Sequence, residues 1–174
     1  MKRGASRTVT LIEVAILLLA LAIGLSLRIG AVQLGVIESG SMEPALVKDD
    51  RCLLNKRRET IAALTRGEVI IFRWNAGDAD TFVKRIVGLP GEQVAIIRGQ
   101  TFINGQPLTE PYCKEPPQNE QPVQAVVAPN SYFVLGDNRN HSEDSRERGS
   151  VARANVVGKL TSIVWPRSRA RPVK

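Results

Sequence analysis

The sequence predicts a mostly β, antiparallel domain behind a single apolar amino-terminal helix. The chain has 174 residues, of which 43% are hydrophobic and 24% charged, a composition typical of a folded globular protein. Beyond residue 30, short apolar runs are separated by turn residues such as Leu89-Pro90-Gly91 and Asn104-Gly105, a pattern typical of strands joined by hairpins. Before them lies one long apolar stretch, residues 9–28, which has the length of a membrane-spanning helix.

Residues 9–28 are the expected transmembrane anchor. The stretch is interrupted before Arg28 only by Thr10, Glu13, Gly24 and Ser26, and a helix of about 20 residues spans the hydrocarbon core of a bilayer. Three basic residues lie in the short segment 1–8, whereas only Arg28 follows the stretch closely. The positive-inside rule therefore predicts a single-pass protein with its amino terminus in the cytoplasm and the rest of the chain outside.

Two alternatives for this stretch stay open. A cleavable secretory signal has a shorter apolar region, and the uncharged part Val14–Leu27 is short enough to be one. The run Thr10–Val14 also resembles the start of a type IV pilin, which would make the chain a structural subunit. A prepilin, however, has Gly before its processing point and Phe after it, where this chain has Thr8 and Val9.

Residues 29–165 are the expected extracytoplasmic β domain, followed by a basic tail, 166–174. A brief helix is expected at Glu59–Leu64, and the proline-rich stretch 107–122 is expected to be a surface loop. The strands are expected at 31–37, 69–72, 81–87, 93–97, 101–103, 132–135 and 156–165.

The net charge of +7 is confined to the two ends of the chain. Residues 29–165 carry sixteen basic and sixteen acidic side chains, so the body lacks the positive surface that binding to a nucleic acid requires. Basic ends beside an apolar segment instead favour the surface of an anionic lipid bilayer. We therefore expect a membrane partner and no nucleic acid.

The cysteine and histidine content excludes the common metal sites. Cys52 and Cys113 are far apart in sequence, and His141 is the single histidine, so neither a zinc site nor a histidine cluster is expected. The two cysteines could form a disulfide in an oxidising compartment or remain free thiols. Their spacing leaves both possibilities open.

Three polar segments interrupt the strand pattern, and the first is Ser39-Gly40-Ser41 after an apolar strand. Serine–glycine pairs are common in turns. The functional interpretation is that Gly40 allows a bend that exposes the Ser41 hydroxyl, with the Ser39 hydroxyl and the Ser41 amide beside it.

The second segment contains Lys84, which shares a strand face with the apolar Phe82 and Ile86. One interpretation is a side chain that reaches past the sheet edge to water. The other is an amine held in an apolar site, where its pKa falls from about 10.4 toward neutrality. A neutral lysine can accept a proton from a serine.

The third segment, 136–146, is a dense polar run directly after an apolar strand. A solvated loop or an aspartate-rich calcium loop would also have this composition, but the interspersed Arg139 and Arg146 argue against a cation site. Asp144 and Arg146 are better interpreted as a local ion pair that stabilises the loop.

In this order the segments resemble the type I signal peptidase (leader peptidase) family of serine–lysine dyad endopeptidases. The resemblance extends from residue 9 to about 165. It rests on Ser-Gly-Ser-Met-Glu-Pro at 39–44, Lys-Arg-Ile-Val-Gly-Leu-Pro-Gly at 84–91, Gly-Asp-Asn-Arg at 136–139 with Ser-x-Asp-Ser-Arg at 142–146, and Arg-Gly-Glu-Val-Ile-Ile-Phe at 66–72.

The resemblance implies a compact, antiparallel, β-barrel-like catalytic domain that lacks the large β insertion of some relatives. It implies an enzyme of the bacterial cytoplasmic membrane, with its catalytic domain on the extracytoplasmic face. That enzyme removes signal peptides from exported preproteins through an acyl-enzyme and needs no cofactor. A self-cleaving repressor-type serine–lysine protease has a similar site, but it is soluble and carries a DNA-binding segment, which the expected anchor and the neutral body speak against.

The resemblance also implies roles for single residues. Ser41 would be the nucleophile and Lys84 the general base, with the Ser39 hydroxyl and the Ser41 amide as the oxyanion hole. Ser142 would orient the Lys84 amine. Asp144 and Arg146 would support that loop, Asp137, Asn138 and Arg139 would shape its entry, and His141 stands at a variable position.

Overall fold

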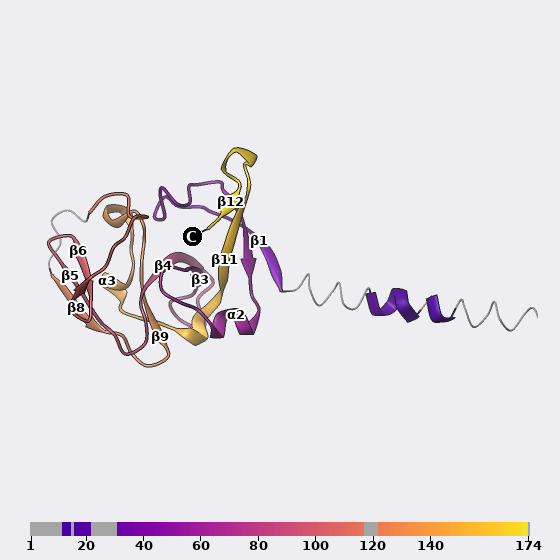
Figure 1. The fold of residues 1–174 in the computed structure, drawn as a ribbon, viewed down its shortest axis with the longest axis horizontal. Coiled ribbons are helices and arrows are strands. Elements are labelled where there is room, and N and C mark those ends of the chain that lie inside the picture. Colours follow the sequence, from indigo (N-terminus) through magenta and orange to yellow (C-terminus); the bar gives the residue numbers. More distant parts are fainter. Residues whose placement is uncertain (1–11, 15, 22–30, 117–121, 174) are drawn as a thin grey trace, which may run out of the picture.

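A computed structural model describes residues 12–14, 16–21, 31–116 and 122–173. Residues 12–14 and 16–21 are helical, and Figure 1 draws them in indigo. Segment 1–8 and much of the expected anchor at 9–28 lie outside the described residues. Within the described ranges, the structure contains no helix with the length and apolarity that crossing a membrane requires.

Most of the domain is one antiparallel sheet. In the described part of the chain it has eight strands in the order β1-β2-β11-β3-β4-β9-β10, with β12 paired to β11 (Figure 1). Their bounds are β1 Val32–Val36, β2 Arg51–Asn55, β3 Val69–Phe72, β4 Phe82–Gly88, β9 Ser131–Leu135, β10 Val151–Ala152, β11 Val156–Trp165 and β12 Arg171–Pro172.

The sheet is curled but does not close into a barrel. Among the described strands, β1 pairs only with β2 and β10 pairs only with β9, so both are edges. A mostly β, antiparallel fold is therefore confirmed, and its form is an open, curled sheet.

A second, smaller sheet follows β4. Its order is β7-β6-β5-β8, and all of its pairs are antiparallel. The bounds are β5 Gln93–Ile97, β6 Gln100–Ile103, β7 Gln106–Pro107 and β8 Val123–Val126. Phe133 and Leu135 of β9 pack with Val94 and Ile96 of β5 in one buried apolar cluster, which joins the two sheets.

Helices are short in the described domain. They are α2 Arg58–Ala62, α3 Ser145–Arg148 and the 3-10 turns η1 Arg139–His141, η2 Arg153–Asn155 and η3 Arg167–Arg169. The helix expected at 59–64 is thus present but ends earlier. Two of these elements, η1 and α3, lie in the third polar segment.

Two of the carboxyl-terminal basic residues, Arg169 and Arg171, make contacts with the body of the fold. Arg171 and Pro172 form β12 against β11. Arg169 donates from Nε to Asp50 Oδ1 at 2.9 Å and from Nη2 to Oδ2 at 3.0 Å, and Asp50 is fully buried. This ion pair ties the end of the chain to the loop between β1 and β2.

Candidate active site

Ser41 lies in the turn that follows β1. Its side chain is buried, with 8% of the residue exposed, and the Ser39 hydroxyl is 3.2 Å from its Oγ. Gly40 does not adopt the left-handed backbone conformation. A Cβ there would meet only the flexible carboxylate of Glu43, so the bend at this turn does not require glycine.

Lys84 lies in β4, opposite Ile70 of β3, and only 4% of the residue is exposed. Its Nζ donates to Ser41 Oγ at 2.8 Å. The side chain therefore does not reach past the sheet edge to water. Its strand neighbours on the same face, Phe82 and Ile86, pack into the largest apolar cluster, as the alternation in the sequence predicts.

Burial lowers the pKa of the Lys84 amine from its ordinary value of 10.5. The carboxylates of Asp144 and Glu143 act in the opposite direction because they favour the charged amine, whereas Arg146 lowers the pKa further. The net direction is downward, because loss of hydration outweighs the partly neutralised carboxylates. The environment thus increases the fraction of the neutral amine, which is the form that can accept a proton.

Asp144 is the centre of the third polar segment. It is fully buried and accepts from Arg146 Nε at 2.8 Å, from the Gly136 amide at 3.0 Å and from the Ser142 hydroxyl at 2.8 Å. It also caps α3 by accepting from the Arg146 amide. The expected ion pair with Arg146 is therefore present, and both carboxylate oxygens are occupied by donors of the protein itself.

Ser142 lies beside the dyad but has a different partner from the expected one. Its hydroxyl donates to Asp144, and among the described residues no hydrogen bond joins Ser142 to Lys84. The Ser142 side chain nevertheless lies close to Ser41. A Cβ on Gly136 would lie 2.2 Å from Ser142 Oγ and 2.6 Å from the Ser41 carbonyl oxygen, so both approach the same backbone atom.

Asn138 connects the first and third polar segments. Its amide donates to the Ser41 carbonyl at 3.0 Å, and its side-chain Nδ2 donates to the Gly40 carbonyl at 3.1 Å. The sequence assigned it only to the entry of the third loop. Nothing in its spacing indicates contact with a turn almost one hundred residues earlier, because sheet topology alone brings the two together.

The Ser41 amide is a possible second donor beside the Ser39 hydroxyl. It makes no hydrogen bond to any described residue. An amide N–H and the Ser39 hydroxyl therefore stand next to the Ser41 oxygen as available donors. This arrangement suits an oxyanion that forms on a carbonyl attacked by Ser41.

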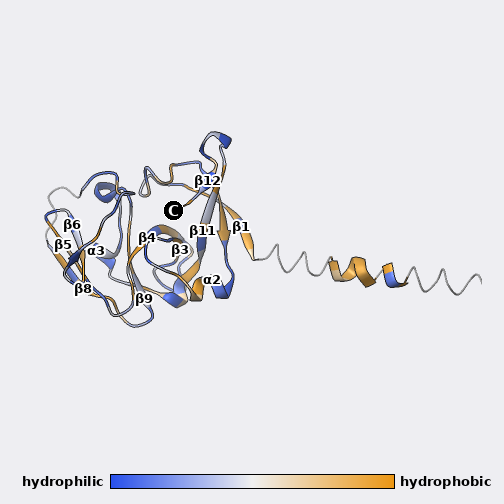
Figure 2. Ribbon diagram, in the orientation of Figure 1, coloured by the Kyte–Doolittle hydropathy of each residue, from blue (hydrophilic) through white to orange (hydrophobic). Residues whose placement is uncertain are grey.

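A groove of about 650 Å³ extends from this point between β1 and the start of β4. Its walls include Leu34, Val36 and Ile37 from the β1 side and Phe82 and Lys84 from the β4 side. Figure 2 shows β1 as one of the strongly apolar strands of the domain. Ser39 and Lys84 thus line an extended, partly apolar groove, and Ser41 is hydrogen-bonded to Lys84.

Comparisons with known proteins identify the family of this chain. The family described as "Signal peptidase, peptidase S26" matches residues 9–165. A signal peptidase I of Leptolyngbya laminosa is 37% identical over 158 residues, which cover 87% of this chain and 77% of that protein. A probable signal peptidase I-2 of Synechocystis sp. is 37% identical over 155 residues, covering 84% and 69%.

Among the solved structures that match is a signal peptidase I from Enterococcus faecalis V583. It is 35% identical, covers 56% of this chain and 97% of its own, and has a TM-score of 0.49. The assignment rests on the sequence matches, which span the segments that hold Ser41, Lys84 and Asp144. The chain belongs to the signal peptidase family, peptidase S26.

Proposed function

We propose that this signal peptidase cleaves preproteins with Ser41 as nucleophile and Lys84 as general base. The observation that carries the proposal is the 2.8 Å contact between Ser41 Oγ and Lys84 Nζ, made where both side chains are almost fully buried. A lysine can serve as a base only when its charge is suppressed, and burial acts in that direction here. Neither the pilin-like subunit nor the self-cleaving repressor is favoured by the family match.

The reaction proceeds in two halves. Neutral Lys84 takes the Ser41 proton as Oγ attacks the scissile carbonyl, and the ammonium then gives that proton to the leaving amine as the peptide bond breaks. An ester between Ser41 and the signal peptide remains. Lys84 next takes a proton from water, the hydroxide attacks the ester, and the proton returns to Ser41.

The oxyanion of each tetrahedral intermediate is held by the Ser39 hydroxyl and the Ser41 amide. The hydroxyl oxygens of Ser39 and Ser41 are 3.2 Å apart, so a carbonyl attacked by Ser41 Oγ lies within reach of the Ser39 hydroxyl. In other hydrolases one such donor contributes about 3 kcal/mol to the transition state. Ser39→Ala would accordingly lower kcat with little change in KM.

Ser142 and Asp144 position the amine. Because Ser142 donates its proton to Asp144, its oxygen lone pairs are left to accept from the amine of Lys84. Arg146 neutralises Asp144 and so limits how far that carboxylate raises the pKa of Lys84. No metal or cofactor takes part in these steps.

The substrate binds in the groove as an extended strand. Residues Phe82–Lys84 pair with β3 on one side, and among the described strands β9 joins β4 only from Arg85 onward. β1 pairs only with β2 among the described strands, so its other edge is also unpaired. A peptide between them would gain main-chain hydrogen bonds, and the apolar walls would select small side chains before the cut.

Residues 9–28 anchor the enzyme in the bacterial cytoplasmic membrane, with the amino terminus in the cytoplasm and the domain 29–165 outside. The support is the apolar length of the stretch and the basic residues before it. Anchoring would bring the groove to the bilayer surface, where signal-peptide cleavage points emerge. Protease accessibility of the domain in intact spheroplasts tests this topology.

Cleavage of a defined preprotein by the detergent-solubilised chain tests the assignment. Ser41→Ala and Lys84→Ala should each abolish processing while the far-ultraviolet circular dichroism stays that of the native domain. A pilin-like protein would cleave nothing, and a self-cleaving protease would cut itself rather than the preprotein. Processing by the Ser41→Ala variant at the native rate would refute the dyad.

A further inference from the structure

The segment Glu110–Lys114, here named the strap, contacts both halves of the proposed site. It contains no strand or helix and is held by a turn in which the Cys113 amide donates to the Glu110 carbonyl at 3.1 Å. The Lys114 amide donates to the Asp137 carbonyl at 3.0 Å, and its Nζ pairs with Glu43 at 3.1 Å. The strap therefore bridges the third polar segment and the turn that carries Ser41.

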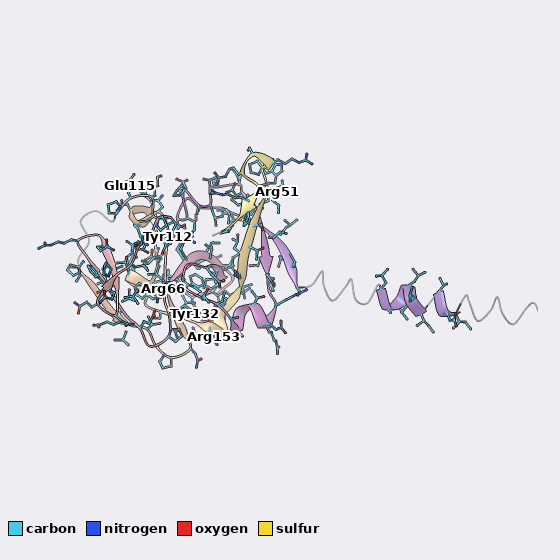
Figure 3. The ribbon with its side chains drawn as sticks, viewed as in Figure 1. Arg51, Arg66, Tyr112, Glu115, Tyr132 and Arg153 are labelled. Carbon is cyan, nitrogen blue, oxygen red and sulfur yellow. The ribbon has the colours of Figure 1, made fainter. Side chains whose placement is uncertain are left out.

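Tyr112 covers the residue that follows Lys84. Arg85 is 1% exposed and binds Asp137 through two hydrogen bonds, of 2.8 and 2.6 Å. The Tyr112 ring (Figure 3) lies 4.1 Å from the Arg85 guanidinium carbon, within the range of a cation–π contact. The ring thus covers one face of an ion pair that fixes β4 to the third polar segment.

Glu110 binds another residue of the same loop, Arg139. It pairs with the buried Arg139 at 2.6 and 3.2 Å, and Arg139 Nε donates to the Gly136 carbonyl at 3.0 Å. The two residues between Gly136 and Arg139 are Asp137, which binds Arg85, and Asn138, which binds the Ser41 turn.

The two contacts of the strap are themselves linked. Tyr112 donates its hydroxyl to Glu110 Oε1 at 3.0 Å. Burial and the adjacent Glu110 carboxylate raise the pKa of Tyr112, so this hydroxyl stays protonated and remains a donor. Glu110 and Tyr112 consequently act as one unit on Arg139 and Arg85.

We propose that the strap is a positioning element of the active site, in which Glu110 and Tyr112 hold the loop that binds Ser41 in register with the strand that carries Lys84. The inference rests on the proposed dyad. In the described structure neither residue hydrogen-bonds to Ser41 or Lys84, so both act through Arg139, Arg85 and the loop between them. Proton transfer depends steeply on the distance between Ser41 Oγ and Lys84 Nζ, and a shift of 1 Å in such a contact can cost about 100-fold in rate.

Steady-state cleavage by the full chain in detergent, on a peptide with alanines before the cut, tests the strap. Tyr112→Ala removes the ring contact, and Glu110→Gln weakens the bond to Arg139 with little change in shape. Each should lower kcat by about 10-fold or more while KM stays within about twofold, because the groove is untouched and only the dyad geometry changes. Tyr112→Phe keeps the ring over Arg85 and should recover most of the kcat lost in Tyr112→Ala.

Glu92→Gln is the matched control. It removes a partly exposed ion pair of 2.6 Å with Arg66, which does not touch the Ser41 turn, so its kcat should equal that of the native chain. If kcat in both Tyr112→Ala and Glu110→Gln is native, or falls only in proportion to the folded fraction measured by thermal unfolding, the strap has no positioning role.

Two further outcomes distinguish a failure of the strap proposal from a failure of the proposed Ser41–Lys84 dyad. If Tyr112→Ala does not fold, the milder Glu110→Gln alone decides the matter by its kcat. Ser41→Ala is run beside the strap variants, and residual cleavage by that variant overturns the dyad. An inactive Ser41→Ala with fully active strap variants overturns the strap alone.

Discussion

Replacing Lys84 by methionine separates two effects of the buried amine, its effect on activity and its effect on stability. Methionine is about as long as lysine and apolar, and only 4% of Lys84 is exposed. Loss of the base should lower kcat by about 100- to 10,000-fold, the usual contribution of general-base catalysis. The free energy of unfolding should rise by about 1–3 kcal/mol, because the desolvated polar group is gone.

The stability gain should depend on pH, and its sign follows from the lowered pKa of Lys84. Above the ordinary value of 10.5 the amine is neutral in both the folded and the unfolded chain, so burial then costs no ionisation energy. As pH falls below that value, the unfolded chain binds a proton that the folded chain resists, and native stability decreases relative to the methionine variant. The advantage of Lys84→Met should therefore be larger at neutral pH than at alkaline pH.

Preprotein cleavage measures the activity, and urea unfolding at pH 7 and pH 11 measures the stability. The control is Lys159→Met, which removes a lysine of β11 that pairs with Glu68, the residue before β3, and should leave cleavage unchanged. Two results would refute the reasoning: activity of Lys84→Met above a tenth of native, or a stability difference that is the same at both pH values.

Three more perturbations follow from the structure. Gly136→Ala should lose about 1–3 kcal/mol of unfolding free energy and most of its kcat, since the new Cβ lies on the hydroxyl and carbonyl oxygens beside the dyad. Arg169→Met should lower the unfolding free energy by about 1–3 kcal/mol at pH 7 without changing cleavage, because it removes the cation that pairs with the buried carboxylate of Asp50. In the folded chain without reductant, an alkylating reagent should label Cys113 but not Cys52, since both are free and Cys52 is buried with its pKa raised to about 11.

Each of these has a control or a contrary outcome. Gly77→Ala has open space around its Cβ and should leave both stability and kcat unchanged. For Asp50, burial raises the pKa, but the hydrogen bonds from Arg169 and the Val47 amide together lower it more. The ionised Asp50 therefore stabilises the folded chain above pH 3.8, and this stabilisation is lost on acidification. An Arg169→Met deficit that persists undiminished below that pH, or a Cys52 that reacts as fast as Cys113, contradicts the structure.

The strand pattern was predictable wherever apolar periodicity was strong. β3, β5 and β11 have the bounds that their sequence patterns predict. β2 was missed because Arg51 and Asn55 flank its apolar centre, which has just three residues, and charged residues continue on both sides. β8 was missed because it follows directly on the proline-rich stretch, where the sequence favours a loop. Edge and mixed strands are stabilised by their neighbours in the sheet, which a local pattern does not contain.

The chemical groups of the site could also be named in advance, but not all of their contacts. Lys84 on an apolar face and serines after a strand are local signals. The bond from Ser142 to Asp144, the bonds from Asn138 to Gly40 and Ser41, and the strap are not, because each joins residues whose partner is chosen by the path of the chain.

The local sequence thus determined which chemical groups this protein has for acyl transfer. It also determined that these groups lie on strands and turns. Only the curled sheet decided that a hydroxyl and an amine 43 positions apart come within 2.8 Å. The physical reason is that hydration is lost through packing in three dimensions. The pKa of this amine is lowered because strands distant in sequence bury it, and no stretch of sequence can do that alone.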